Sequence, residues 1–202
     1  MAAAAVLLAG DTALAATHPL LSADRTVELD VQSAPIGPLV PLMELTNAMS
    51  GAVQLVAGAI GVLLIVVWDR RAAVLVGLGA MASLFENVLK LIVHRPRPTP
   101  NLVHVQHVVS GYSFPSGHAT FFTWFTILVL VVVVPRLPRL AQVVAVAAGA
   151  LVILVACLGR IWAGAHWPTD VAGGFLLSVT WAALLCWGAF RLRPTAARRT
   201  AG

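Results

Sequence analysis

Long apolar stretches separated by short polar links are the feature that most constrains this fold. Five of these stretches approach the length of about 20 residues that a helix needs to cross a bilayer, and they are Gly51–Trp68, Ala72–Val93, His118–Val134, Leu140–Leu158 and Val171–Phe190. Of the 202 residues, 59% are hydrophobic and only 10% are charged, whereas soluble domains carry about 25% charged residues. The sequence therefore predicts an all-α protein, a polytopic membrane helical bundle with five clear spans.

The beginning of the chain, Met1–Ala16, is also apolar, although Asp11 interrupts it. A cleaved signal peptide would need positive charge before the apolar run and a small-residue site after it. The sequence Ala13-Leu14-Ala15 fits such a site, but the basic region is missing. We therefore expect a short or truncated N-terminal helix as a sixth span.

Residues 17–50 are the one stretch of mixed polarity, and prolines punctuate it at Pro19, Pro35, Pro38 and Pro41. Because proline fixes φ and lacks a backbone donor, we expect a loop with at most a short interfacial helix, on the outer side of the membrane. The predicted organisation is an N-terminal segment (1–50), a membrane domain (51–190) and a basic cytoplasmic tail (191–202). Within the membrane domain, short links make neighbouring spans antiparallel.

The net charge of +5 is distributed as a topology signal. Eight of the thirteen basic residues lie in three places, which are Arg70/Arg71, Arg136/Arg139 and the tail Arg191, Arg193, Arg198 and Arg199. If the spans alternate, these places share one side, which the positive-inside rule makes cytoplasmic. Membrane topology and contact with anionic lipid account for the excess of basic over acidic residues. The membrane is therefore the expected partner, and nucleic-acid binding gains no support.

The two cysteines, Cys157 and Cys186, lie in different apolar stretches and have no paired spacing. We expect both to be buried thiols that pack as small hydrophobic side chains. No Cys/His spacing of the zinc type occurs, so neither a metal nor a cofactor is predicted.

Three polar patches interrupt the apolar chain, and the predicted topology puts all three at the same end of the bundle. The patches are Lys90 with Arg97-Pro98, then Pro115-Ser116-Gly117-His118, then Arg160 with His166 and Asp170. Nothing in the span pattern forces them together. Their shared position therefore predicts a single site.

The middle patch predicts a helix start, because Ser116 is a good N-cap and Pro115 cannot continue a helix backward. The free N–H groups there attract anions, and Gly117 allows a close approach, although alone this is an ordinary helix cap. Lys90, Arg97 and Arg160 would complete a phosphate cradle. Lys90 could equally pair with Glu86 on the same helix face or extend to the membrane interface, and Arg97 could be a solvated loop charge.

His166 and Asp170 lie four residues apart at the start of the last span. A carboxylate bonded to one ring nitrogen fixes the tautomer and leaves the other nitrogen free to attack. His118 would then act as the general acid. Such a pair caps helices as often as it catalyses reactions, but the three cations and the second histidine favour catalysis.

The whole pattern resembles the type 2 phosphatidic acid phosphatase family, which includes lipid phosphate phosphatases and vanadium haloperoxidases. Its signature is a lysine, six residues and Arg-Pro, later Pro-Ser-Gly-His, and later Ser-Arg, five residues, His, three residues and Asp. The chain carries these motifs between Lys90 and Asp170, with Gly159 in place of the serine. It also carries a second Arg-Pro pair at Arg95, which we interpret as auxiliary.

The resemblance implies a metal-independent lipid phosphatase in the cell membrane that works through a phosphohistidine and needs no cofactor. His166 would attack phosphorus, Asp170 would orient it, and His118 would protonate the leaving group and then activate water. Lys90, Arg97, Ser116, Gly117 and Arg160 would bind the phosphate. The implied substrate is a lipid phosphate or diphosphate at the outer leaflet, such as undecaprenyl diphosphate or another polyprenyl phosphate, phosphatidate or phosphatidylglycerophosphate.

Two other interpretations remain open. A vanadate-dependent haloperoxidase would use the same cradle, but those relatives are soluble and the five spans argue against it. A non-catalytic lipid-binding protein or transporter would need only the cations, so His118 and the His166/Asp170 pair argue against it. The remaining histidines, His18, His94, His104 and His107, are expected to have no role.

Overall fold

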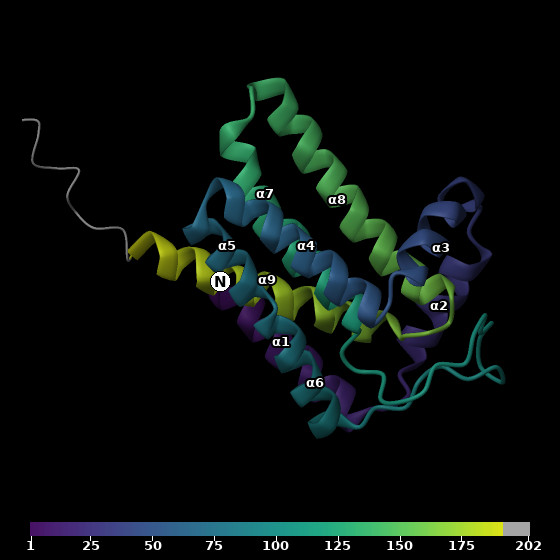
Figure 1. Ribbon diagram of the computed structural model, residues 1–202. Helices are drawn as coiled ribbons and strands as arrows, with labels where there is room; N and C mark the ends of the chain where they lie inside the picture. The colour runs from purple at the N-terminus through teal and green to yellow at the C-terminus, as the bar shows by residue number, and fades with distance from the viewer. Residues whose placement is uncertain (192–202) are drawn as a thin grey trace, which may run out of the picture.

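The computed structural model describes residues 1–191, and within them every regular element is helical (Figure 1). The elements are α1 (Ala2–Thr17), α2 (Ser22–Ser33), the 3₁₀ turn η1 (Gly37–Leu39), α3 (Val40–Ala48), α4 (Ala52–Trp68), α5 (Arg70–Gly79), α6 (Met81–Val93), α7 (Gly117–Val133), the 3₁₀ turn η2 (Val134–Arg136), α8 (Arg139–Trp162) and α9 (Pro168–Arg191). The all-α fold class is confirmed. The predicted basic tail, apart from Arg191, lies outside the described residues.

The apolar stretches form helices that suit a membrane. Four helical units in residues 1–191 are long and apolar enough to cross a bilayer, and they are α5 with α6, α7 with η2, α8 and α9. The count rises to six if each bent pair forms one span, since α1 meets α2 at 101° and η1 with α3 meets α4 at 87°. All five predicted stretches are helical, and the expected N-terminal helix is α1.

Residues 17–50 differ from the expected loop, because they hold the two helices α2 and α3. The prolines lie where helices tolerate them. Pro19 and Pro35 flank α2, and Pro38 and Pro41 occupy the first turns of η1 and α3. Proline is favoured at a first helical turn, since the N–H it lacks would have no partner there. The prolines therefore mark breaks in the chain as predicted, but the segments between them are helices and not a loop.

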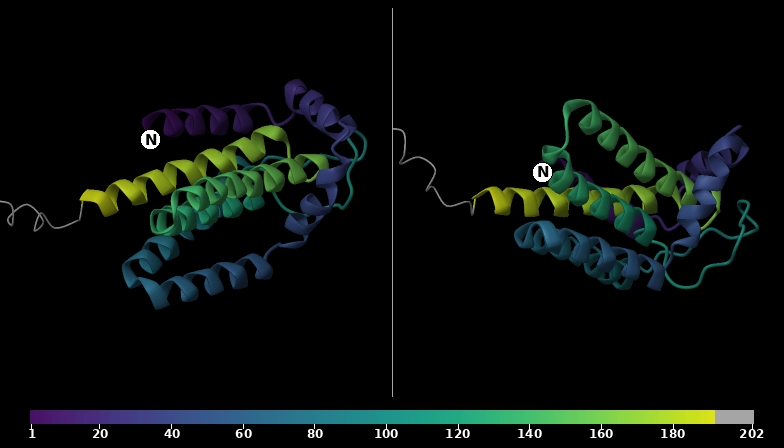
Figure 2. Two further views of the ribbon diagram at one scale, coloured as in Figure 1. Left: turned by 90° about the horizontal axis from the view of Figure 1, so that it is seen from above. Right: turned by 45° about the horizontal axis from the view of Figure 1, so that its top comes forward.

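The centre of the bundle is α7, which packs against α5, α6, α8 and α9 (Figure 2). Its inward face carries Phe121, Trp124 and Leu128, all of them buried in the main apolar cluster. The crossing with α9 is close at Gly174, where an added Cβ would lie 2.6 Å from the carbonyl oxygen of Ser116. Small residues let helices approach closely in membranes, and here the approach brings the start of α9 against the start of α7.

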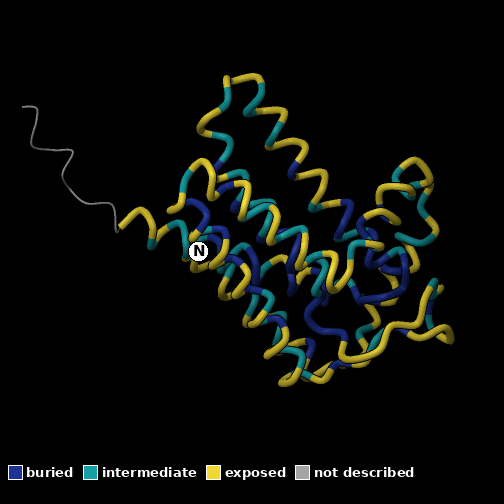
Figure 3. The backbone as a smooth tube through the Cα atoms, in the orientation of Figure 1, coloured by how far each residue is buried: buried dark blue, intermediate teal, exposed yellow. Residues whose placement is uncertain are grey.

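The two ends of the bundle differ in charge. At one end Asp69 caps α5 by accepting from the Arg71 and Ala72 amides, and it also pairs with Arg136 at 3.0 Å. The arginines of both short links therefore gather at this end, as the alternation of spans predicts. The other end holds the starts of α7 and α9 and the C-terminal end of α8, and in Figure 3 it combines buried backbone with a long exposed loop.

Candidate active site

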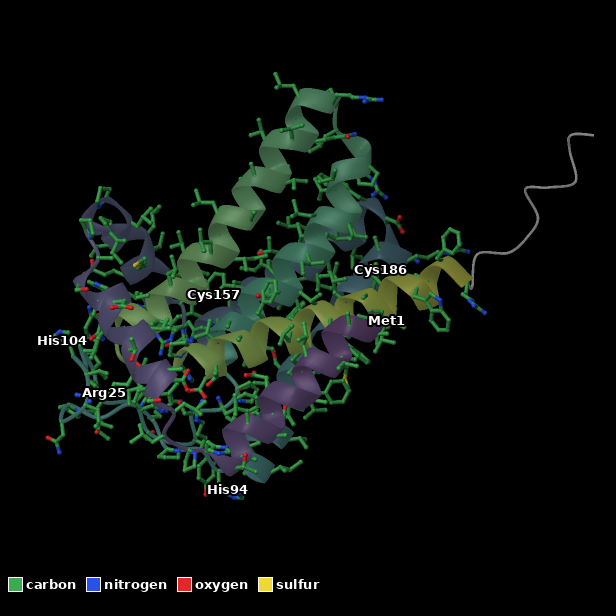
Figure 4. The ribbon with its side chains drawn as sticks, turned by 180° about the vertical axis from the view of Figure 1, so that it is seen from behind. Met1, Arg25, His94, His104, Cys157 and Cys186 are labelled. Carbon is green, nitrogen blue, oxygen red and sulfur yellow. The ribbon has the colours of Figure 1, made fainter. Side chains whose placement is uncertain are left out.

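A long loop between α6 and α7, residues 94–116, supplies Arg97 and Ser116 to the site. His94 ends α6 in the left-handed conformation, with φ of 53°, and Pro96 and Pro98 disfavour any continuation of the helix. α2 fastens the far part of the loop, since Arg25 donates to the carbonyl of Leu102 and Gln32 exchanges hydrogen bonds with the backbone of His104. Arg25, His94 and His104 lie at this end in Figure 4, away from Met1 and Cys186.

The start of α7 forms as the sequence predicts. Ser116 is its N-cap and accepts from the Ala119 amide at 3.5 Å, while the Ser116 N–H donates to the backbone oxygen of Asp170 at 2.9 Å. Lys90 reaches this start from α6, donating to the carbonyl of Pro115 at 2.9 Å. Lys90 also pairs with Glu86 at 2.5 Å, so the alternative partner predicted for it is present, and both contacts are made together.

His166 lies in the link between α8 and α9, only 2% exposed. Its Nδ1 lies 2.8 Å from the carbonyl oxygen of Ser113, and its Nε2 lies 2.9 Å from Nη1 of Arg97. A carbonyl can only accept and a guanidinium can only donate. The proton of a neutral ring is therefore on Nδ1, and the lone pair of Nε2 faces Arg97. Arg97 is held there by the carbonyls of Ala165 and Gly111, at 2.7 and 3.1 Å.

Asp170 does not make the expected direct hydrogen bond to His166, since Oδ2 lies 3.7 Å from Nδ1. The carboxylate is already occupied. Arg95 donates to Oδ1 at 2.7 Å, and Oδ2 accepts from the Ser113 hydroxyl and from the Trp167 amide. Ser113 therefore lies between His166 and Asp170. Its hydroxyl donates to Asp170, and its carbonyl accepts from the ring of His166. The influence of Asp170 on the ring passes through Ser113.

Arg95 is more than the auxiliary cation of the sequence interpretation, because its side chain is fully buried. It pairs with Asp24 of α2 at 2.5 Å and with Asp170, and it donates further to Thr169 and to the carbonyl of Pro19. Thr169 in turn donates to Asp24 through both its N–H and its hydroxyl. This network ties the N-terminal segment to the first turn of α9.

A cavity of about 440 Å³ opens beside these residues and is lined by His118 and Arg160. Arg160 was expected in the link, but α8 continues to Trp162 and carries it in its last turn. Within the described chain, Nε2 of His118 and Nε of Arg160 are buried and have no hydrogen-bond partner. Buried polar atoms are rarely left unpaired, so these two atoms indicate the place of a polar ligand.

The electrostatic setting of His166 keeps its ring neutral. Burial lowers its pKa well below the ordinary value, and the positive charges of Arg97, Arg160 and Lys90 lower it further. Of these three cations, Arg97 contacts the ring directly. A buried ring without its proton, next to three cations, suits an anionic partner better than a cationic one.

The neutral state of His166 can be measured. When the pH falls through about 6.5, where an unperturbed histidine gains its proton, we expect the His166 ring to keep its neutral Nδ1–H form. Nitrogen NMR of histidine-labelled protein in detergent reads the state of each ring, and loss of one signal in His166→Asn identifies the resonance. A His166 signal that titrates near the unperturbed value would contradict the buried geometry.

All eight predicted site residues meet at this end of the bundle. They are Lys90, Arg97, Ser116, Gly117, His118, Arg160, His166 and Asp170. Sequence reasoning missed Asp24, Asn47 and Ser113. It also underestimated the importance of Arg95, for which the second Arg-Pro pair was the available signal in the sequence. His104 and His107 are both exposed, and His107 also lines the cavity. Cys157 and Cys186 are free cysteines of intermediate burial, so the prediction that both are buried thiols was wrong.

Comparisons with known proteins agree with the architecture. No curated protein sequence matches the chain. A transmembrane PAP2 type phosphatidylglycerolphosphate phosphatase from Bacillus subtilis has a crystal structure similar to this one, with a TM-score of 0.80 at 19% sequence identity. The similarity covers 96% of this chain and 98% of that one, which establishes a shared multi-pass membrane fold. The family model of the PAP2 superfamily matches residues 71–194, more than half of the chain and the whole of the three-patch region, and the protein therefore belongs to the PAP2 superfamily.

Proposed function

We propose that the protein is an integral membrane phosphatase that hydrolyses a lipid phosphate or diphosphate through a phosphohistidine intermediate. One observation carries the proposal. A buried, neutral histidine whose unprotonated Nε2 accepts from Arg97 lies near two further cations, beside a cavity that is lined by His118 and Arg160, each with an unpaired buried nitrogen. Nucleophile, proton donor and charge stabilisation are the three requirements of phosphoryl transfer through a covalent intermediate.

In the first step, Nε2 of His166 attacks phosphorus and the bond from phosphorus to the leaving oxygen breaks. Arg97 donates to that nitrogen in the free site, so it must turn toward the phosphoryl oxygens as the phosphate enters. Lys90, Arg160 and the first amides of α7, at Gly117 and capped by Ser116, supply the other positive charge. Charge stabilisation of this kind is commonly the largest catalytic contribution.

His118 acts first as the general acid and then as the general base. It gives its proton to the departing oxygen, and afterwards it takes a proton from the water that attacks the phosphohistidine. The second step releases inorganic phosphate and restores the neutral His166. The ring is held in one tautomer by Ser113, which Asp170 fixes in turn, so the histidine is ready for the next cycle. No metal ion takes part in this scheme.

The lipid character of the substrate follows from the position of the site. The cavity lies at one end of a bundle whose helices expose Leu and Val side chains over most of their length. A phosphate there can enter the cradle while its hydrocarbon chains stay in the bilayer. The positive-inside rule favours a cytoplasmic location for the opposite end, where the arginines gather, and on this basis we propose that the site faces the outer leaflet of the cell membrane. The substrate candidates are polyprenyl phosphates and diphosphates, phosphatidate, and phosphatidylglycerophosphate, for which the Bacillus subtilis relative is named.

Phosphate release by the purified protein tests the proposal. Detergent-solubilised enzyme with EDTA should release inorganic phosphate from at least one of three lipids, namely polyprenyl diphosphate, phosphatidate and phosphatidylglycerophosphate. The ratio of kcat/KM values then identifies the preferred lipid. Saturable binding of all three without release would instead favour the non-catalytic binding protein, and activity that EDTA abolishes would contradict a metal-independent reaction.

A further inference from the structure

The three cations of the site are held by different parts of the chain. Lys90 is held by Glu86 and by the carbonyl of Pro115, and Arg97 by two loop carbonyls. All of these contacts lie inside the region that the family model covers, residues 71–194. Arg160 is held differently. Within residues 1–191 its guanidinium makes one hydrogen bond, from Nη1 to Oδ1 of Asn47 at 2.9 Å.

Asn47 is itself fixed in one orientation. Its Nδ2 donates to the carbonyl of Gly159 at 3.2 Å, which leaves Oδ1 facing Arg160. The two partners settle which atom is oxygen and which is nitrogen, because a carbonyl only accepts and a guanidinium only donates. Asn47 therefore bridges the residue before Arg160 and the guanidinium of Arg160 itself.

The packing of α3 on α8 makes this bridge possible. Gly159 has no Cβ, and one placed there would lie 3.2 Å from Cβ of Met43 and 3.5 Å from Oδ1 of Asn47. Met43 is fully buried in this contact. α3 thus lies directly against the last turn of α8, at the place in Figure 1 where the N-terminal helices meet the end of α8. A larger residue at position 159 would move Asn47 away from Arg160.

We propose that Asn47 is a positioning residue that aims Arg160 into the cavity and so sets the affinity of the site for phosphate. Both residues line the cavity, and the Nε atom of Arg160 is buried there without a partner among residues 1–191. An arginine side chain has large rotamer freedom, so a single well-placed acceptor decides how much of the time it faces the ligand. The inference rests on the proposed function for its link to turnover, but phosphate binding tests it independently.

The experiment measures inorganic phosphate binding, as the rise in unfolding temperature on titration, together with KM and kcat for the preferred lipid phosphate. In Asn47→Ala we expect the phosphate Kd and the KM to rise in parallel by about tenfold, the scale of one hydrogen bond to a charged group. The value of kcat should fall by a smaller factor. Asn87→Ala is the matched control, since it makes the same change of residue type at an exposed side chain that does not line the cavity and that donates to the carbonyl of Ser83 on its own helix.

A second variant separates positioning from a merely structural role. Asn47→Asp has the same shape, but its carboxylate would pair with the guanidinium of Arg160 and compete with phosphate for it. We expect it to weaken phosphate binding more than Asn47→Ala does, with less loss of stability in the absence of phosphate. A wild-type protein that does not bind phosphate, or variants that bind it as tightly as the wild type, would overturn the inference. Failure of the lipid phosphatase reaction alone would leave the binding result standing.

Discussion

Replacement of His166 by alanine should abolish phosphate release while the protein remains folded. The change removes Nε2, the one nucleophilic atom that the buried site presents to phosphorus, and turnover should fall by more than about a thousandfold, as when a covalent nucleophile is lost. The link around His166 is also held by the Arg97 bond to Ala165 and by the Trp167 bond to Asp170, so its backbone should keep its course. Detergent-phase unfolding and phosphate release measure the two effects separately.

His104→Ala is the control for this experiment, because His104 is exposed at the same end of the protein and its contacts are made by its backbone. It should keep near wild-type activity. Rapid quenching with radiolabelled substrate adds a direct test, since a phosphohistidine survives base and is lost in acid. Turnover by His166→Ala near the wild-type rate, or a phosphorylated intermediate in that variant, would exclude His166 as the nucleophile.

The parts of the site that could be predicted from the sequence depend on local rules. Ser116 after a proline marks a helix start whatever surrounds it, and the structure confirms α7 from Gly117. Alternation of apolar spans and short links fixes which ends of the helices lie together. These two rules were enough to bring Lys90, His118 and His166 to one place without any knowledge of their contacts.

The parts that could not be predicted depend on contacts between distant segments. Asp24 is an ordinary residue in the first turn of α2, and nothing in its neighbours reveals that a fully buried Arg95 lies against it. Asn47 likewise acquires its place only because Gly159 lets α3 approach α8. The His166–Asp170 spacing indicated a direct hydrogen bond, and Ser113 intervenes because the loop folds back across both residues. Spacing along the sequence limits which residues can lie together, but packing between distant segments determines which of their atoms are in contact.

Arg95→Ala should destabilise the protein more than alanine substitution of any other cation at this end of the bundle, and it should also lose activity. The carboxylates of Asp24 and Asp170 would both remain buried, at 2% and 0% exposure, without their shared cation. Removing one partner of a buried ion pair costs about 3–5 kcal/mol. Activity falls with it, because Asp170 would no longer hold Ser113 against the ring of His166. The measurements are the free energy of unfolding in denaturant and phosphate release at a temperature where the variant is folded.

Arg136→Ala provides the matched comparison, since it removes an arginine from an aspartate pair of similar length at the opposite end of the bundle, where both side chains are exposed. Solvent and counterions replace an exposed partner at little cost, so stability and turnover should both stay close to wild type. Arg95→Lys should fall between the two variants, because one ammonium cannot match the geometry by which the guanidinium reaches Asp24, Thr169 and Asp170 together. Equal losses in Arg95→Ala and Arg136→Ala would mean that the buried network adds nothing beyond an ordinary ion pair. A large loss confined to Arg95→Ala would establish that the buried network of Arg95, Asp24 and Asp170 contributes far more than an exposed ion pair.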